Sequence, residues 1–154
     1  MPAVDGRGRD GPLRVLFLCS ANSCRSRMAE AFARRLKAGL LEVASAGTRP
    51  GPLDPRAAQV MREVGIELSP RPGRHLGELA GRGFDYVVTL CERAREECPV
   101  FPGARHVHVD FPDPRRFAGA GGGEEEILAR YRKLREEIRA FVAGLPGTLE
   151  GAGT

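Results

Sequence analysis

The most reactive stretch of the sequence is a short polar segment in which a cysteine precedes an arginine by six positions. Cys19 is followed by Ser-Ala-Asn-Ser-Cys and then by Arg25 and Ser26. A thiolate is a strong nucleophile, and a guanidinium can hold two oxygens of a phosphate-like anion. The pattern indicates covalent capture of such an oxyanion by Cys19, with Arg25 as its clamp. A buried cysteine that merely ends a strand is the alternative.

The residues after Cys19 are predicted to form an oxyanion-binding loop. A tight loop after a strand can turn successive backbone N–H groups inward, and the N-terminus of a following helix adds about half a positive charge. We expect the Ser26 hydroxyl to donate to the thiolate, the Asn22 amide to hold the loop in shape, and Cys24 to pack. The other serines could equally be small turn residues. The expected loop residues are Ser20, Ala21, Asn22, Ser23, Cys24, Arg25 and Ser26.

Two further cysteines lie far along the chain from this loop. Cys91 and Cys98 are seven positions apart, while Cys19 and Cys24 are five apart, so neither pair has the spacing of a zinc knuckle. Residues 1–12 lack the apolar centre of a secretory signal, so we expect a cytoplasmic protein with reduced thiols. This favours thiol chemistry over a disulfide framework or structural zinc.

The elements that must position Cys19 follow from hydrophobic periodicity. Residues 13–19 form an apolar run that is typical of a strand buried on both faces of a parallel sheet. Met28, Phe32 and Leu36 recur every four residues and predict a helix over 26–37. Open α/β sheets bind ligands where a strand leads into a helix in this way.

Strand and helix patterns alternate through the rest of the chain. Asp54 and Pro55 are a cap and a first-turn proline for a helix that ends near Gly65. Between this helix and the next strand, only a possible short helix near 75–80 is expected. Three more strands are expected, at residues 41–46, 84–90 and 106–109. The last helix carries apolar residues three and four apart: Ile127, Tyr131, Leu134, Ile138 and Phe141.

These elements predict an α/β fold, with one domain built on an open, parallel, four-stranded sheet flanked by helices. We expect a flexible leader at 1–12, a catalytic domain at 13–143 and a frayed tail at 144–154. No apolar run approaches the roughly 18 residues of a membrane-spanning helix, so no membrane partner is expected. The net charge of +4 arises from 24 basic residues interleaved with 20 acidic ones, which does not favour nucleic acid as a partner.

Several motifs together resemble a known family. The loop from Cys19 to Ser26, continued by Met-Ala-Glu, resembles the signature of low-molecular-weight protein tyrosine phosphatases and of the thioredoxin-coupled arsenate reductases that share their fold. Val-Val-Thr-Leu before Cys91 and the later Cys98-Pro pair are similar to the reductase branch, and Ser-Ala-Gly at 45–47 is similar to both branches. The resemblance covers about residues 13–142 and implies a phosphatase-like fold.

The reductase resemblance implies roles for the second cysteine pair. Cys19 would attack arsenate, Cys91 would attack Cys19 as arsenite leaves, and Cys98 would close a disulfide that thioredoxin reduces. The alternative is two unrelated thiols, one ending a strand and one on a helix. Two helical turns separate positions by about 10 Å, whereas a disulfide requires Cα atoms about 4.4–6.8 Å apart. Disulfide formation should therefore unwind residues 91–98.

Asp113 matches the general acid of the resemblance, which protonates the leaving oxygen. An Asp-Pro step is also a common turn starter, and Asp110 is the weaker candidate for this role. The phosphatase branch continues with aromatic residues, whereas Arg115-Arg116-Phe117 follows here, and this disfavours a phosphotyrosine substrate.

Two other positions of the resemblance affect the loop. Ala21 stands where many relatives have glycine, so a positive φ there would be strained. Some reductases hold a potassium ion at positions matching Asn22, Glu30 and Ser45, with an aspartate replaced here by Arg74. A cation beside arginine is disfavoured, so no metal or cofactor is expected. The three histidines are expected to be surface or strand residues: His75, His106 and His108.

Three functions remain open from the sequence. The first is reduction of arsenate through Cys19, Cys91 and Cys98, with thioredoxin as the reductant. The second is a phosphatase that uses Cys19, Arg25 and Asp113 and leaves the other thiols idle. The third is a non-catalytic thiol module that binds oxyanions or arsenite without turnover.

Overall fold

The apolar run that ends at Cys19 forms an inner strand of a parallel sheet. In the computed structural model, β1 (Leu13–Cys19) lies between β2 (Leu41–Gly47) and β3 (Tyr86–Thr89), and β4 (Arg105–His108) lies outside β3. All three pairings are parallel, and the fully buried residues 15–18 form the centre of the core. The structure describes residues 11–79, 81–117 and 122–152. The predicted four-stranded α/β fold is confirmed.

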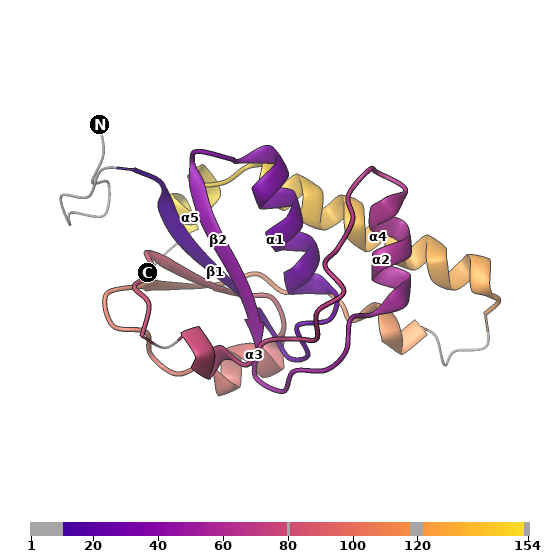
Figure 1. Ribbon diagram of the computed structural model, residues 1–154, viewed down its shortest axis with the longest axis horizontal. Helices are drawn as coiled ribbons and strands as arrows, with labels where there is room; N and C mark the ends of the chain where they lie inside the picture. Colours follow the sequence, from indigo (N-terminus) through magenta and orange to yellow (C-terminus); the bar gives the residue numbers. More distant parts are fainter. Residues whose placement is uncertain (1–10, 80, 118–121, 153–154) are drawn as a thin grey trace.

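Helices cover the sheet and complete the core. α1 (Arg25–Leu36) packs against β1 and β2, and it lies beside the long helix α4 (Glu124–Ala143), as Figure 1 shows. α2 (Pro55–Arg62) packs against α4, while the short α3 (Glu92–Glu97) contacts β1 and β3. Two 3₁₀ turns complete this part: η1 (Leu76–Leu79) and η2 (Pro114–Phe117).

The segments that follow the strands meet at one edge of the sheet, because parallel strands all end on the same side. The N–H of Leu90 donates to the carbonyl of Leu18 at 2.8 Å, so Cys91 comes next to the end of β1. The N–H of Phe111 donates to the carbonyl of Leu90 at 2.9 Å and brings in the segment after β4. The loop after Cys19 thus shares its edge with both later segments.

Most element boundaries differ from the predicted ones by one or two residues. The third strand is shorter than the predicted 84–90, and α1 begins one residue earlier than predicted. Leu36 is 42% exposed instead of buried, because it is the last residue of α1. The turn η2 has no counterpart among the predicted elements, since Asp-Pro-Arg-Arg carries no hydrophobic period.

The predicted fraying from Gly144 is wrong for the described residues 144–152. Residues 147–152 form the helix α5 (Gly147–Ala152). Leu145, in the turn before α5, and Leu149, within α5, are buried at 2% and 0% exposure, so the segment packs on the core. The glycines and proline of this segment obscured that short apolar pattern. Of the predicted leader 1–12, all but the exposed Gly11 and Pro12 lie outside the described residues.

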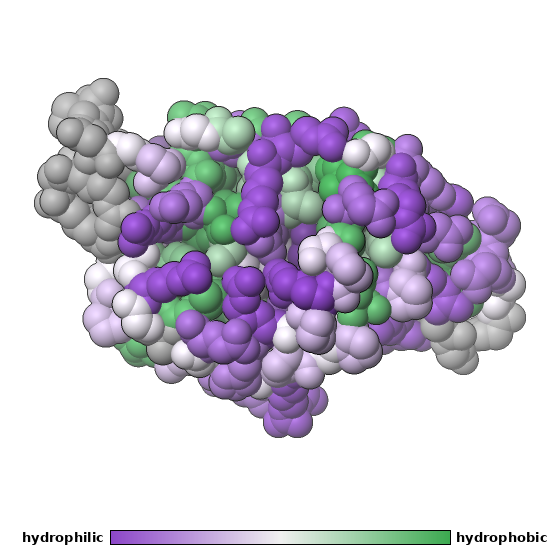
Figure 2. Space-filling model, in the orientation of Figure 1, coloured by the Kyte–Doolittle hydropathy of each residue, from purple (hydrophilic) through white to green (hydrophobic). Residues whose placement is uncertain are grey.

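The surface in the view of Figure 1 is mainly hydrophilic, with apolar side chains between the charged ones (Figure 2). Among the helices of the described residues, none has both the length and the apolar character that crossing a bilayer requires.

Candidate active site

Cys19 ends β1 and is buried, with only 2% of its surface exposed. Its Sγ lies 2.9 Å from the Oγ of Ser26, in the first turn of α1. That helix has neither a side-chain cap at Cys24 nor an acidic residue in its first turn. The first N–H groups of α1 are therefore without a side-chain acceptor, an arrangement that suits an incoming anion.

Asn22 holds the loop in the conformation that the site requires. Its φ is +52°, and it is the one non-glycine residue with a positive φ among those described. Its Nδ2 donates to Ser26 at 2.8 Å and to Ser45 at 2.9 Å, while its Oδ1 accepts the backbone N–H of Arg74 at 2.9 Å. Asparagine tolerates the left-handed region, so the strain expected at Ala21 does not arise.

These contacts determine which way the Ser26 hydroxyl points. Because the Oγ of Ser26 already accepts a hydrogen bond from Asn22, its own hydrogen is free to point at the sulfur of Cys19. The Ser26 hydroxyl is thus placed to donate a hydrogen bond to the sulfur of Cys19. The geometry therefore supports the expected roles of Ser26 and Asn22.

The backbone of the loop is enclosed by residues 47–51 and by Gly73. Arg49 N–H donates to the Ser20 carbonyl at 2.8 Å, and Gly51 N–H donates to the Ala21 carbonyl at 3.0 Å. A Cβ on Gly47 would collide with the carbonyl oxygen of Ser20, so only glycine allows this approach. The glycine of the Ser-Ala-Gly sequence at the end of β2 is thus required by the packing of the loop.

Arg25 is buried at 6% exposure and points toward the segment after β4. Its Nη1 donates to the carbonyl of Phe111 at 3.0 Å, and its Nη2 lies 3.8 Å from Oδ2 of Asp113. Two of the residues expected to act on the substrate are therefore neighbours in the structure.

Asp113 is held chiefly by Arg115, a residue that the sequence analysis did not select for the site. The guanidinium of Arg115 contacts both carboxylate oxygens, at 3.1 and 3.0 Å, and its backbone N–H donates at 3.0 Å. Partial burial acts to raise the pKa of Asp113, but these hydrogen bonds and the charge of Arg25 outweigh it and lower the pKa. Asp113 is thus a carboxylate in this arrangement.

Cys91 and Cys98 lie at the two ends of α3, and all four cysteines are free thiols. Cys91 is buried at 6% exposure, and its Sγ accepts the N–H of Ala94 at 3.4 Å as a cap. The sequence analysis placed Cys98 on a helix. In the structure Cys98 follows α3 in an extended conformation. Partial burial raises the pKa of the Cys98 thiol.

Cys24 packs behind the loop, as expected. Burial raises its pKa well above the ordinary value, and the charge of Asp54 adds to this. The side chain of Asp54 caps α2 and also accepts a hydrogen bond from the hydroxyl of Tyr131 at 2.7 Å. The backbone N–H of Asp54 donates to the Ser23 carbonyl at 3.1 Å. The link from α4 through Asp54 to the loop could not be found from sequence spacing, because Tyr131 is 77 positions away.

The residues around Glu30 do not suit a monovalent cation. Glu30 is buried, accepts the hydroxyl of Ser45, and forms ion pairs with Arg34 at 2.6 Å and Arg71 at 3.4 Å. The positive charge beside Glu30 therefore comes from Arg34 and Arg71, while Arg74 contributes its backbone N–H to Asn22. No cluster of three or more His, Cys, Asp or Glu among the described residues could hold a metal ion.

The histidines are occupied by local contacts. His75 and His106 accept backbone N–H groups on a ring nitrogen, and His108 contacts Thr89 at 2.8 Å. These contacts agree with the expected surface and strand positions.

A parallel sheet with a cysteine and an arginine in the loop after its inner strand is typical of α/β proteins that bind oxyanions. The sequence model of the family "Low molecular weight phosphotyrosine protein phosphatase" matches residues 14–151. The chain belongs to this family, which confirms the resemblance drawn from the motifs.

Several relatives that are similar to the chain over most of its length are named arsenate reductases. An arsenate reductase of Halalkalibacterium halodurans is 38% identical over 125 residues, which is 80% of this chain and 88% of the relative. A solved structure of an arsenate reductase in the phosphate binding state has a TM-score of 0.69 and 28% identity, and covers 88% of this chain and 98% of that one. A solved structure of a thioredoxin-dependent arsenate reductase of Corynebacterium glutamicum has a TM-score of 0.60 and 27% identity. The match covers 90% of this chain and 65% of that one.

Proposed function

We propose that this protein reduces arsenate to arsenite through Cys19, Cys91 and Cys98. The observation that carries the proposal is the adjacency of β1 and β3, because it brings Cys91 to the sheet edge where Cys19 begins the oxyanion loop. A phosphatase needs no second thiol there, whereas reduction of arsenate needs two electrons. The arsenate reductase relatives support the same choice.

The first step is attack of the Cys19 thiolate on arsenic. The sulfur–arsenic bond forms while one arsenic–oxygen bond breaks, and the leaving oxygen takes up protons from the solvent to become water. Arg25 and the free N–H groups at the start of α1 hold the remaining oxygens. Ser26 stabilises the thiolate before the attack.

The second and third steps transfer the electrons. The Cys91 thiolate attacks the sulfur of Cys19, a sulfur–sulfur bond forms, and the electron pair of the sulfur–arsenic bond remains on arsenic, which leaves as arsenite. The Cys98 thiolate then attacks Cys91 and releases Cys19 as a thiolate. The protein is left with one disulfide between Cys91 and Cys98.

The third step requires α3 to rearrange. Cys91 and Cys98 flank a six-residue helix that is about 9 Å long at about 1.5 Å per residue, whereas a disulfide requires Cα atoms about 4.4–6.8 Å apart. The same step removes the sulfur of Cys91 from Ala94, which it now caps. We therefore propose that the segment from Cys91 to Cys98 unwinds when it is oxidised.

Thioredoxin is the proposed reductant of that disulfide. Cys98 is partly exposed, so an external thiol can reach this end of the pair. The named thioredoxin dependence of the Corynebacterium glutamicum relative supports this choice. Four free thiols suit a reducing compartment, and we propose the cytoplasm.

Phosphatase activity is the second candidate, and the contact between Arg25 and Asp113 beside the loop that begins at Cys19 supports it. The general acid of a phosphatase must carry a proton, but the contacts from Arg115 keep Asp113 ionised. We therefore expect only weak hydrolysis of phosphate esters, and mainly of those with good leaving groups.

The deciding experiment measures arsenite production with thioredoxin, thioredoxin reductase and NADPH, beside hydrolysis of a small aryl phosphate. The intact protein should produce arsenite steadily only when thioredoxin is present, and without thioredoxin each reduced chain should produce one arsenite. Cys91→Ser should lose steady arsenate turnover and keep the hydrolysis. Steady arsenite production by Cys91→Ser would rule out the cascade, and phosphate release without arsenite in the intact protein would favour the phosphatase. Binding without any product would favour a non-catalytic module.

A further inference from the structure

Arg27 is a buried cation without a carboxylate partner. Its exposure is 3%, and none of the carboxylates that the structure describes forms an ion pair with it. Its two guanidinium hydrogen bonds go to backbone carbonyls, at 3.2 Å to Asn22 and at 2.6 Å to Ser69. A guanidinium has five N–H donors, so several remain for another acceptor. Buried charges in proteins are usually paired with an opposite charge.

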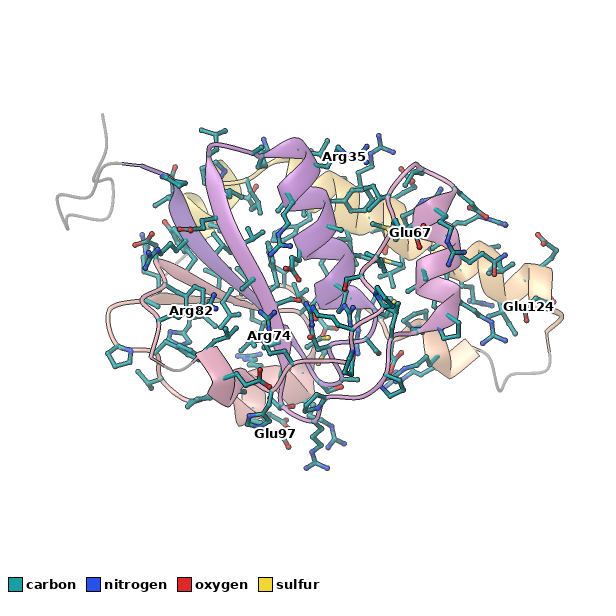
Figure 3. All side chains as sticks on the ribbon, viewed as in Figure 1. Arg35, Glu67, Arg74, Arg82, Glu97 and Glu124 are labelled. Carbon is teal, nitrogen blue, oxygen red and sulfur yellow. The ribbon has the colours of Figure 1, made fainter. Side chains whose placement is uncertain are left out.

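Arg27 lines a hollow of about 340 Å³ between α1 and the segment that follows α2. Three other arginines line the same hollow: Arg34, Arg35 and Arg71. We call this hollow the arginine pocket. Figure 3 shows Arg35 on α1 and Glu67 on the facing segment, at two sides of the pocket.

The carboxylates of the arginine pocket do not balance its arginines. Glu30 is shared between Arg34 and Arg71, and Glu67 pairs with Arg62, which does not line the pocket. The side chain of Arg35 donates to the carbonyl of Gly65 instead. Four guanidinium groups against two carboxylates leave the pocket with an excess of positive charge.

The arginines also act on one another. Burial, the charge of Arg71 and that of Arg74 lower the pKa of Arg27, and the opposing effect of Glu30 does not compensate. Burial, together with Arg74 and Arg34, likewise lowers the pKa of Arg71. An anion placed among these side chains would relieve this repulsion and supply the charge that Arg27 lacks.

We propose that the arginine pocket is a second oxyanion site, which takes a phosphate-sized dianion separately from the Cys19 loop. Arginine suits such a ligand because its planar donors match pairs of phosphate oxygens. A bound anion would also affect the Cys19 loop, because Arg27 donates to the backbone carbonyl of Asn22 within that loop. The proposal does not depend on which reaction Cys19 performs.

The test is phosphate binding measured by titration calorimetry, with inorganic phosphate as the probe. The intact chain should bind two phosphates. Arg25→Ala, which removes the clamp of the Cys19 loop, should retain one. Adding Arg71→Gln to Arg25→Ala should weaken the remaining binding about tenfold or more, because hydrogen bonds to charged groups are among the strongest in proteins.

A matched control removes one positive charge elsewhere. Arg95 lies on the exposed face of α3, so Arg95→Gln in the Arg25→Ala background should leave phosphate binding unchanged. Arg27→Gln should act like Arg71→Gln, and if it fails to fold, the partly exposed Arg71 still decides the matter. Glycerol 3-phosphate, run beside inorganic phosphate, distinguishes a site for free phosphate from one that also takes a terminal phosphoryl group.

The proposal is wrong if Arg25→Ala binds no phosphate. It is equally wrong if Arg71→Gln binds phosphate as tightly as Arg95→Gln in that background.

Discussion

The Cys19 loop and the segment from Cys91 to Cys98 both carry reactive thiols, but they are built in opposite ways. The loop is buried and braced from several elements, by Asn22, by Gly47 and by the backbone of residues 49–51. The later segment is a six-residue helix whose side chains are mostly exposed, with Ala94 as its one buried helical residue. Holding a tetrahedral anion requires fixed donors, whereas bringing two distant sulfurs together requires a segment that can move.

The largest effect is expected where the loop is most tightly packed. Gly47→Ala would force a Cβ into the carbonyl of Ser20 and within 2.9 Å of the N of Asn22, so the loop must shift. Displacement of catalytic groups by about 1 Å typically costs about 100-fold in rate, and we expect at least that loss in arsenate turnover and in aryl phosphate hydrolysis. Gly51→Ala, where a Cβ meets nothing within 4 Å, is the matched control and should retain both activities. Equal activity of the two variants would show that the loop is not rigid.

The second prediction concerns oxidation of the segment from Cys91 to Cys98. When the disulfide between Cys91 and Cys98 forms, backbone amides of α3 should lose protection against hydrogen exchange, because the helix unwinds. Amides of β1 and α1 should keep theirs. Exchange measured by mass spectrometry on reduced and oxidised protein checks this, and unchanged protection of α3 after oxidation would contradict the proposed rearrangement.

The third prediction concerns Asp113, which contacts Arg25 at the end of the rigid Cys19 loop. A general acid acts when protonated, so hydrolysis falls as pH rises through its pKa. Arg115 contributes to the lowered pKa of Asp113, so Arg115→Ala should raise that pKa and move this fall to higher pH. The pH profile of aryl phosphate hydrolysis measures the shift.

The neighbouring Arg116→Ala is the control for Arg115→Ala, since the guanidinium contacts of Asp113 come from Arg115 and Arg25. It should leave the pH profile where it is. Identical profiles for both variants would mean that Arg115 does not set the protonation of Asp113.

The smallest effect is expected on the surface of α3. Arg49 contacts Glu97 at 3.0 Å, and the Arg49 side chain is 66% exposed. Exposed ion pairs contribute little to stability, so Glu97→Gln should leave the free energy of unfolding in urea unchanged within error. A clear loss of stability would mean that α3 is held more firmly than its exposure indicates.

The hydrophobic pattern was sufficient for the sheet, because a strand buried on both faces must be apolar throughout, as residues 15–18 are. It failed at α5, where Leu145 and Leu149 are too few to form a visible period among glycines. It located α1 within one residue but did not predict that Arg25, Arg27 and Glu30 in its first turns are buried. A helical period assumes that one face is apolar and the other solvated, and charged residues that are buried among partners break that assumption.

The sequence by itself determined the parallel α/β fold, the loop from Cys19 to Ser26 and the presence of Asp113 as a candidate acid. These features depend on local order along the chain: an apolar strand, a polar loop and a helix that follow one another. Only the tertiary structure decided that Arg115 holds Asp113, that Arg71 and Arg34 pair with Glu30, and that Arg27 is buried without an ion pair to any carboxylate of the described residues. The physical reason is that the ionisation of a carboxylate and the pairing of a buried cation depend on which charges lie within a few ångströms, and folding, not sequence distance, determines those neighbours.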